Sequence, residues 1–91
     1  MIRRVVRIEN ELGLHARAAA RLVKLASQFE SDIKLSRVDG REKIDGKSIL
    51  GILLLAASQG TQLEVVVDGR DEEAALDAID ALVRGKFGEE K

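Results

Sequence analysis

Hydrophobic residues along this chain follow two repeating patterns, which indicate strands alternating with helices. Where they alternate with polar residues or form β-branched runs, as at 33–37, they predict strands. Where they recur every three to four positions, as Leu22, Ala26 and Phe29 do, they predict helices with one buried side. The predicted strands are 2–8, 33–37, 41–44 and 63–67. The predicted helices are 16–29, 48–57 and 72–87, the last with an inner stripe of Ala75, Leu76, Ile79, Leu82, Val83 and Phe87.

The resulting order, βαββαβα, suggests an antiparallel sheet with its helices on one face, which is a two-layer α+β domain. Short polar segments separate the elements. Asp39-Gly40 predicts a hairpin turn, because both residues tolerate positive φ. Gly60 is expected to end the second helix in a left-handed conformation, and Asp71 to cap the start of the third.

Composition narrows the class of protein. Residues 1–91 are enough for a single small domain, and 45% apolar residues can supply its core without disulfides, since cysteine is absent. A net charge of −1 and the lack of Trp and Tyr argue against nucleic-acid binding. No apolar segment follows Met1-Ile2-Arg3-Arg4, and 49–57 is too short to span a bilayer. We therefore expect a soluble cytoplasmic monomer without a signal peptide, membrane contact, metal or cofactor.

The only histidine, His15, stands where the first strand pattern gives way to the first helix. A helix N-terminus offers unpaired backbone N–H groups and a partial positive charge, which together favour anions. A neutral imidazole there can act as a nucleophile towards phosphorus, and Arg17 can hold the phosphoryl oxygens. The alternative is a histidine that only caps or decorates the helix start. Gly13 before it and Arg17 after it favour the phosphoryl site.

Two motifs carry a family resemblance. The segment Gly13–Ser27, GLHARAAARLVKLAS, resembles the phosphorylation-site helix of HPr, the histidine phosphocarrier of the bacterial phosphoenolpyruvate-dependent phosphotransferase system. The segment Gly46–Gly51, GKSILG, is similar to that family's regulatory-serine helix. Both occur in the family's order, and the resemblance covers essentially the whole chain. It implies an open-faced β-sandwich, with a four-stranded antiparallel sheet and three helices on one face.

The resemblance also implies a function. His15 would accept a phosphoryl group from phospho-Enzyme I, on Nδ1, and pass it to IIA components of sugar phosphotransferase systems, with Arg17 as the clamp. The residues alone do not choose between the ring nitrogens. Such a protein is a phosphoryl-group carrier rather than a free-standing enzyme.

A partner surface is expected on two helices. Arg17, Arg21, Lys24 and Gln28 form one stripe of the first helix, which is either a docking track for acidic partners or an ordinary solvated face. The second helix has more apolar residues than one stripe can bury; Ile52 and Leu55 are assigned to the core. Leu50 and Leu53 are then predicted to form an exposed apolar patch, with a fully buried helix as the alternative. The expected partner-binding residues are Arg21, Lys24, Lys47, Ile49, Leu50 and Leu53.

Ser48 is expected to cap the second helix, because serine is a preferred residue at that position. The resemblance adds regulatory phosphorylation by HPr kinase/phosphorylase. The two roles are compatible, since phosphate is electrostatically favoured at a helix N-terminus.

The chain departs from the family pattern at two places. Ala18 stands where the family usually has proline. Unlike proline, alanine has a backbone N–H in this first helical turn. Between Asp32 and Ser48 the chain has about two residues more than the commonest family spacing, which a longer hairpin around Asp39-Gly40 would accommodate while keeping strand register.

Two other interpretations remain open at this point. A nitrogen-type or regulatory HPr paralogue would use the same residues. A small α+β ligand-binding or interaction module, with an incidental histidine, would use none of them for chemistry.

Overall fold

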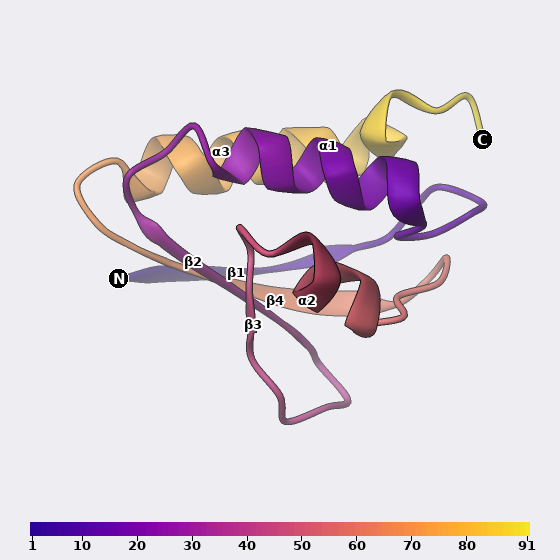
Figure 1. The fold of residues 1–91 in the computed structure, drawn as a ribbon, viewed down its shortest axis with the longest axis horizontal. Coiled ribbons are helices and arrows are strands. Elements are labelled where there is room, and N and C mark those ends of the chain that lie inside the picture. Colours follow the sequence, from indigo (N-terminus) through magenta and orange to yellow (C-terminus); the bar gives the residue numbers. More distant parts are fainter.

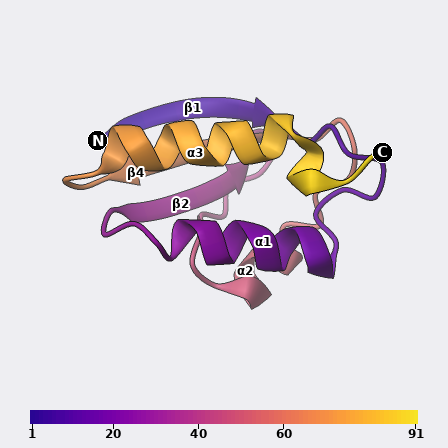
Figure 2. The ribbon, with the colours of Figure 1, turned by 90° about the horizontal axis from the view of Figure 1, so that it is seen from above.

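In the computed structural model, which describes residues 1–91, four strands form one sheet and three helices cover one of its faces (Figures 1 and 2). The strands are β1 (Ile2–Arg7), β2 (Asp32–Arg37), β3 (Ile44–Asp45) and β4 (Gln62–Asp68). The helices are α1 (Ala16–Ala26), α2 (Ile49–Leu54), α3 (Glu72–Arg84) and a short 3₁₀ turn, η1 (Lys86–Gly88). The predicted order βαββαβα is confirmed.

The sheet has the strand order β1-β4-β2-β3, and every neighbouring pair is antiparallel. The last strand of the chain, β4, therefore lies in the middle, between β1 and β2. Val65 pairs with Arg4 on one side and with Leu35 on the other, so β4 joins the two halves of the chain. The expected fold class, an open-faced sandwich with an antiparallel sheet, is confirmed.

The core lies between the sheet and the helices. Leu63, Val65 and Val67 of β4 point towards α1 and α3 and are fully buried, while the residues between them are not. This alternation follows from the two-residue period of a strand. The predicted inner stripe of α3 is buried as expected, with Leu82 partly buried at its edge, but the helix ends at Arg84, and the buried Phe87 lies beyond it in η1. No helix is both long and apolar enough to cross a membrane.

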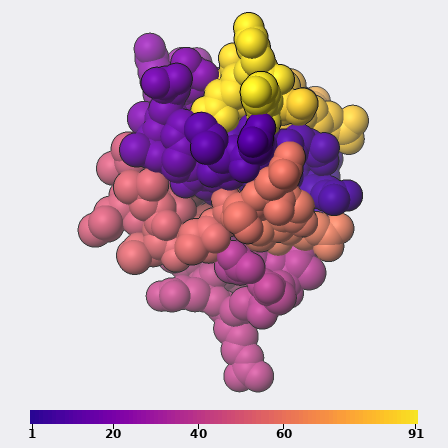
Figure 3. Space-filling model, turned by 90° about the vertical axis from the view of Figure 1, so that its right-hand side faces the viewer, coloured from indigo at the N-terminus to yellow at the C-terminus, as the bar shows by residue number.

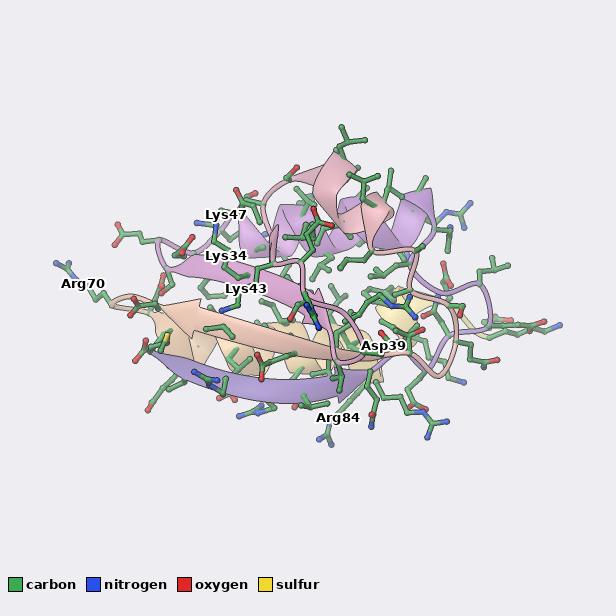
Figure 4. All side chains as sticks on the ribbon, turned by 90° about the horizontal axis from the view of Figure 1, so that it is seen from below. Lys34, Asp39, Lys43, Lys47, Arg70 and Arg84 are labelled. Atoms are coloured by element: carbon green, nitrogen blue, oxygen red, sulfur yellow. The ribbon has the colours of Figure 1, made fainter.

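The other face of the sheet has no helix over it. Figure 4 is drawn from that side, with Lys34 on β2 and Lys43 in the loop that leads to β3. Val5 of β1 also lies on this face and is exposed. All three helices therefore lie on the opposite side of the molecule.

The hairpin before α2 differs from the prediction. β3 occupies Ile44–Asp45 instead of 41–44, because only these residues pair with β2, and the polar residues before them project as a loop (Figure 1). β2 and β3 form the hairpin that was predicted around Asp39-Gly40, but neither of these residues has the positive φ that was expected. The Gly40 N–H instead donates to the Arg37 carbonyl (3.0 Å). A long loop gives the chain room to turn without that strained geometry.

The end of α2 also differs. The helix stops at Leu54, not Ala57, because Ala56 adopts the left-handed conformation (φ 49°) that was expected at Gly60. Gly60 has positive φ as well, but in the turn before β4. Arg37 donates to the carbonyls of Leu55 and Ala56 (both 3.2 Å), so a cation satisfies the carboxyl end of the helix.

Asp71 precedes α3 as predicted, but its carboxylate does not bond to that helix. It accepts hydrogen bonds from the backbone N–H groups of Glu30 (2.9 Å) and Ser31 (3.0 Å), and from the Ser31 hydroxyl. Asp71 therefore ties the turn between α1 and β2 to the start of α3. The Ser31 hydroxyl, with the Glu30 N–H, holds the pKa of Asp71 below its ordinary value.

We expect Asp71→Asn to lower the melting temperature at neutral pH. The difference in melting temperature between the variant and the wild type should become smaller at acidic pH. The folded-state pKa of Asp71 is depressed, so its stabilisation is complete above the unfolded value of about 3.9 and is lost as the pH falls through the lower folded value. Thermal melts between about pH 7 and about pH 2.5 test this. Glu42→Gln, at an exposed carboxylate, is the control; a gap that stays constant with pH contradicts the assignment.

Candidate functional site

The loop between β1 and α1 is held tightly against the end of α2. The Leu14 N–H donates to the Ala57 carbonyl (2.8 Å), and Leu14 is buried. Gly13 has φ +69°, and a Cβ built there would lie 2.5 Å from the Ala57 carbonyl oxygen and 2.9 Å from the Cα of Ser58. Only glycine fits this close approach of two backbones. The contact fixes the point at which α1 begins.

His15 follows directly as the N-cap residue of α1, with extended backbone (φ −76°, ψ 179°). Its carbonyl accepts from Ala19 (2.8 Å), but its side chain makes no capping hydrogen bond. His15 is therefore the N-cap residue by position, but its side chain does not cap the helix. The backbone N–H groups of Ala16, Arg17 and Ala18 have no acceptor in the protein, which is the usual state of a first helical turn. They are free to bind an anion beside the ring.

The C-terminal tail reaches this site. Figure 3 shows the last residues, in yellow, lying on the start of α1 and the loop before it, in indigo. A carboxylate oxygen of Glu89 contacts Nε2 of His15, and the other oxygen accepts from Nδ2 of Asn10 (2.8 Å). The hydrogen bond from Asn10, followed by that from His15, holds the pKa of Glu89 below its ordinary value. Of the His15 ring nitrogens, Nδ1 has no partner in the protein.

The predicted basic residues of α1 have different surroundings. Arg17 is exposed and forms no ion pair or hydrogen bond within the protein, so its guanidinium is available. Arg21 is also exposed, but it donates to the Phe87 carbonyl and so holds the tail. Both line a surface hollow between α1 and the tail, together with Glu89. Lys24 lies in the last turn of α1 and is exposed.

An apolar patch, which we call the α2 patch, consists of four exposed side chains. They are Ile49 (45% exposed), Leu50 (66%), Leu53 (38%) and Leu54 (70%). Ile52 and Leu55 are buried, as predicted, so the alternative of a fully buried helix is wrong. Leu54 was not among the expected partner residues and is the most exposed of the four.

Ser48 caps α2 as predicted, since its hydroxyl accepts from the Gly51 N–H (3.1 Å). Lys47 is half-buried, and its ammonium donates to the Phe29 carbonyl (2.8 Å), at the end of α1 far from His15. Ser48 therefore lies next to the α2 patch, whereas the ammonium of Lys47 is already bonded to Phe29.

Sequence reasoning missed two residues of the site, Asn10 and Glu89. Asn10 is fully buried and donates from Nδ2 both to the Gly13 carbonyl (2.8 Å) and to Glu89. Its spacing of three residues from Gly13 is a weak turn signal that could have marked it. Glu89 is 74 positions from His15, and no local pattern links the two.

An open-faced α+β sandwich that presents a histidine at the start of its first helix is the architecture of small histidine phosphocarriers. Comparison of this chain with known protein families, sequences and structures agrees with this class. The family model described as "PTS HPr component phosphorylation site" matches residues 2–85, so the chain belongs to the HPr family of phosphocarrier proteins of the phosphotransferase system. Membership of this family favours a phosphocarrier over an unrelated interaction module.

Individual relatives are similar along nearly their whole length. The chain is 48% identical to the phosphocarrier protein HPr of Cupriavidus necator over 89 residues, 98% of each chain. It is 47% identical to the phosphocarrier protein NPr of Shewanella violacea, over 97% of this chain and 94% of that one. The crystal structure of HPr from Thermoanaerobacter tengcongensis matches with a TM-score of 0.93 and 42% identity, covering 100% of both chains.

We expect Gly13→Ala to destabilise the protein by about 1–3 kcal/mol, because it combines a left-handed residue with a backbone clash at Ala57. Denaturant melts measure the loss. Gly40→Ala is the matched control, since its φ is not left-handed and its nearest neighbour would be an ordinary 3.4 Å away. Equal melts for the two variants would contradict the close approach at Gly13.

Proposed function

We propose that His15 accepts a phosphoryl group from phospho-Enzyme I and passes it to IIA components of the phosphotransferase system in the cytoplasm. The observation that carries this proposal is the placement of His15. Its ring stands at the start of α1 beside three free backbone N–H groups, and its Nδ1 is unpartnered. We therefore assign Nδ1 as the accepting atom, in agreement with the family resemblance.

The chemistry needs no metal or cofactor. The Nδ1 lone pair forms the new N–P bond while the donor's N–P bond breaks and returns its electron pair to the donor nitrogen. Arg17 and the N–H groups of Ala16 and Ala18 then bind the phosphoryl oxygens. Transfer to a IIA component is the same step in reverse, with a new acceptor nitrogen.

Docking is assigned to the α2 patch and the basic stripe of α1. Four exposed aliphatic side chains in one helix of a small protein are typical of a partner site. Arg17 and Lys24 are exposed and unpaired, which suits acidic partners and speeds encounter. We propose that Enzyme I and the IIA domains contact this common surface in turn, with the protein acting as a monomer.

We further propose that Ser48 is a regulatory phosphorylation site for an HPr kinase/phosphorylase. Its hydroxyl caps α2 from a half-buried position next to Ile49 and Leu50. A phosphate there would add negative charge at the edge of the α2 patch while remaining favourable for the helix.

A nitrogen-type carrier is the second candidate, since this chain is 47% identical to an NPr and 48% identical to an HPr. Identity does not separate the two branches. Incubating the phosphorylated protein with a sugar-type and a nitrogen-type IIA domain decides between them, because the true acceptor is phosphorylated faster.

We expect His15→Ala to abolish phosphoryl acceptance and to leave the fold intact, because His15 is only partly buried and makes no capping bond. The test is incubation with labelled phosphoenolpyruvate and Enzyme I, with a thermal melt to check folding. Stable labelling of the variant at another residue would refute the assignment of His15.

We expect Ser48→Asp to change stability by no more than about 0.5 kcal/mol, because a carboxylate also caps a helix. Acceptance from Enzyme I should fall on the order of tenfold, equivalent to about 1.4 kcal/mol of binding. Gln62→Glu adds the same charge on the open face of the sheet and is the control. Equal transfer rates for the two variants would place Ser48 outside the interface.

A further inference from the structure

The tail that carries Glu89 is fastened to the body of the protein at several points. Phe87 is fully buried, and Arg21 donates to its carbonyl. Further along, the Lys91 carbonyl accepts from the Glu11 N–H. Lys86 (φ 57°) and Phe87 (φ 56°) are both in the left-handed region, which costs energy for residues other than glycine. Such backbone strain persists only where the surrounding contacts fix it.

These contacts bring the Glu89 carboxylate between two side chains of the site. One oxygen accepts from Asn10 Nδ2, and the other faces His15 Nε2. The orientation of the Asn10 amide is fixed, because Nδ2 also donates to the Gly13 carbonyl. Turning the amide would place Oδ1 against two acceptor oxygens. Asn10 Oδ1 is buried and receives no hydrogen bond, which costs free energy. The contacts of Nδ2 hold the amide in this orientation despite that cost.

We propose that Glu89 is a positioning residue for phosphoryl transfer, which holds the proton of the His15 ring on Nε2 and so leaves the lone pair on Nδ1. A carboxylate can only accept a hydrogen bond, so Nε2 must be the donor when it faces Glu89. The bond made by one ring nitrogen sets the state of the other. This inference rests on the proposed function of His15.

The charge changes during the reaction are consistent with this role. When Nδ1 forms the N–P bond, Nε2 keeps its proton and the ring becomes a phosphorylated imidazolium. The Glu89 carboxylate faces the positive charge that develops on the ring, and Arg17 faces the phosphoryl group. No proton has to leave the site, because the hydrogen bond from Nε2 to Glu89 is already present before transfer.

Glu89→Gln separates this role from a merely structural one. Asn10 Nδ2, which faces this position, can only donate, so it takes the carbonyl oxygen of the new glutamine, and the glutamine NH₂ is left facing His15 Nε2. Nε2 must then accept, which moves the ring proton to Nδ1 and blocks the nucleophile. Glu89→Ala removes the contact without imposing the wrong tautomer. Glutamine should therefore be more harmful than alanine, although it is closer in size to glutamate.

The experiment uses the full chain as wild type, Glu89→Gln, Glu89→Ala and Glu90→Gln. Glu90 is exposed and makes no ion pair or hydrogen bond, so its variant controls for charge in the tail. Nitrogen-15 NMR of the unphosphorylated His15 ring reports the tautomer, and Enzyme I with phosphoenolpyruvate gives kcat and KM.

For Glu89→Gln we expect the Nδ1–H tautomer and a kcat lower by about 10-fold to 100-fold, with KM within about twofold. Glu89→Ala should lose less, and Glu90→Gln should match the wild type. An unchanged tautomer in Glu89→Gln, or a larger loss in alanine than in glutamine, overturns the proposal and leaves His15 as the acceptor. A wild type that takes no phosphoryl group refutes the proposed function instead, while the NMR result still decides the role of Glu89.

Discussion

The contact between the backbones of Gly13 and Leu14 and those of Ala57 and Ser58 determines where the functional parts of the protein lie. It fixes the first residue of α1, and so places His15 at the N-cap with three free N–H groups after it. The same contact holds the segment between α2 and β4, which orients the α2 patch relative to the histidine. This single backbone contact thus links the proposed phosphoryl site at His15 to the proposed docking surface on α2.

The path of the C-terminal tail depends on a balance between backbone strain at Lys86 and Phe87 and the contacts of Phe87. Two residues other than glycine in the left-handed region cost roughly 2–4 kcal/mol together. Full burial of Phe87 contributes about 1.5–3 kcal/mol, and its hydrogen bond from Arg21 about 1 kcal/mol more. These magnitudes are nearly equal, so the two Phe87 anchors roughly offset the strain, and the contacts of Glu89 and Lys91 add to them. That path carries Glu89 to His15.

The elements and the central site followed from the sequence because both depend on local patterns. Hydrophobic periodicity located β4 and α3, and the change of period before Ala16 placed His15 at a helix start. The errors arose where distant contacts override a local preference. Asp71 is a good N-cap in isolation, yet it bonds to Glu30 and Ser31. Position 56 is left-handed although it is alanine, because the adjacent Ala57 is fixed by Leu14. Glu89 reaches the site only through the folded tail.

Ala18, where the family usually has proline, shows what gives the site its rigidity. Its side chain is fully buried and its N–H has no acceptor in the protein, so alanine and proline leave the hydrogen bonds of the helix equally complete. Proline would limit the conformations of the helix start by itself. In this chain the same restriction comes from contacts around it: Gly13 against Ala57, and the hydrogen bond from Asn10 to the Gly13 carbonyl. The alanine therefore leaves the site ordered and adds one more N–H donor beside His15.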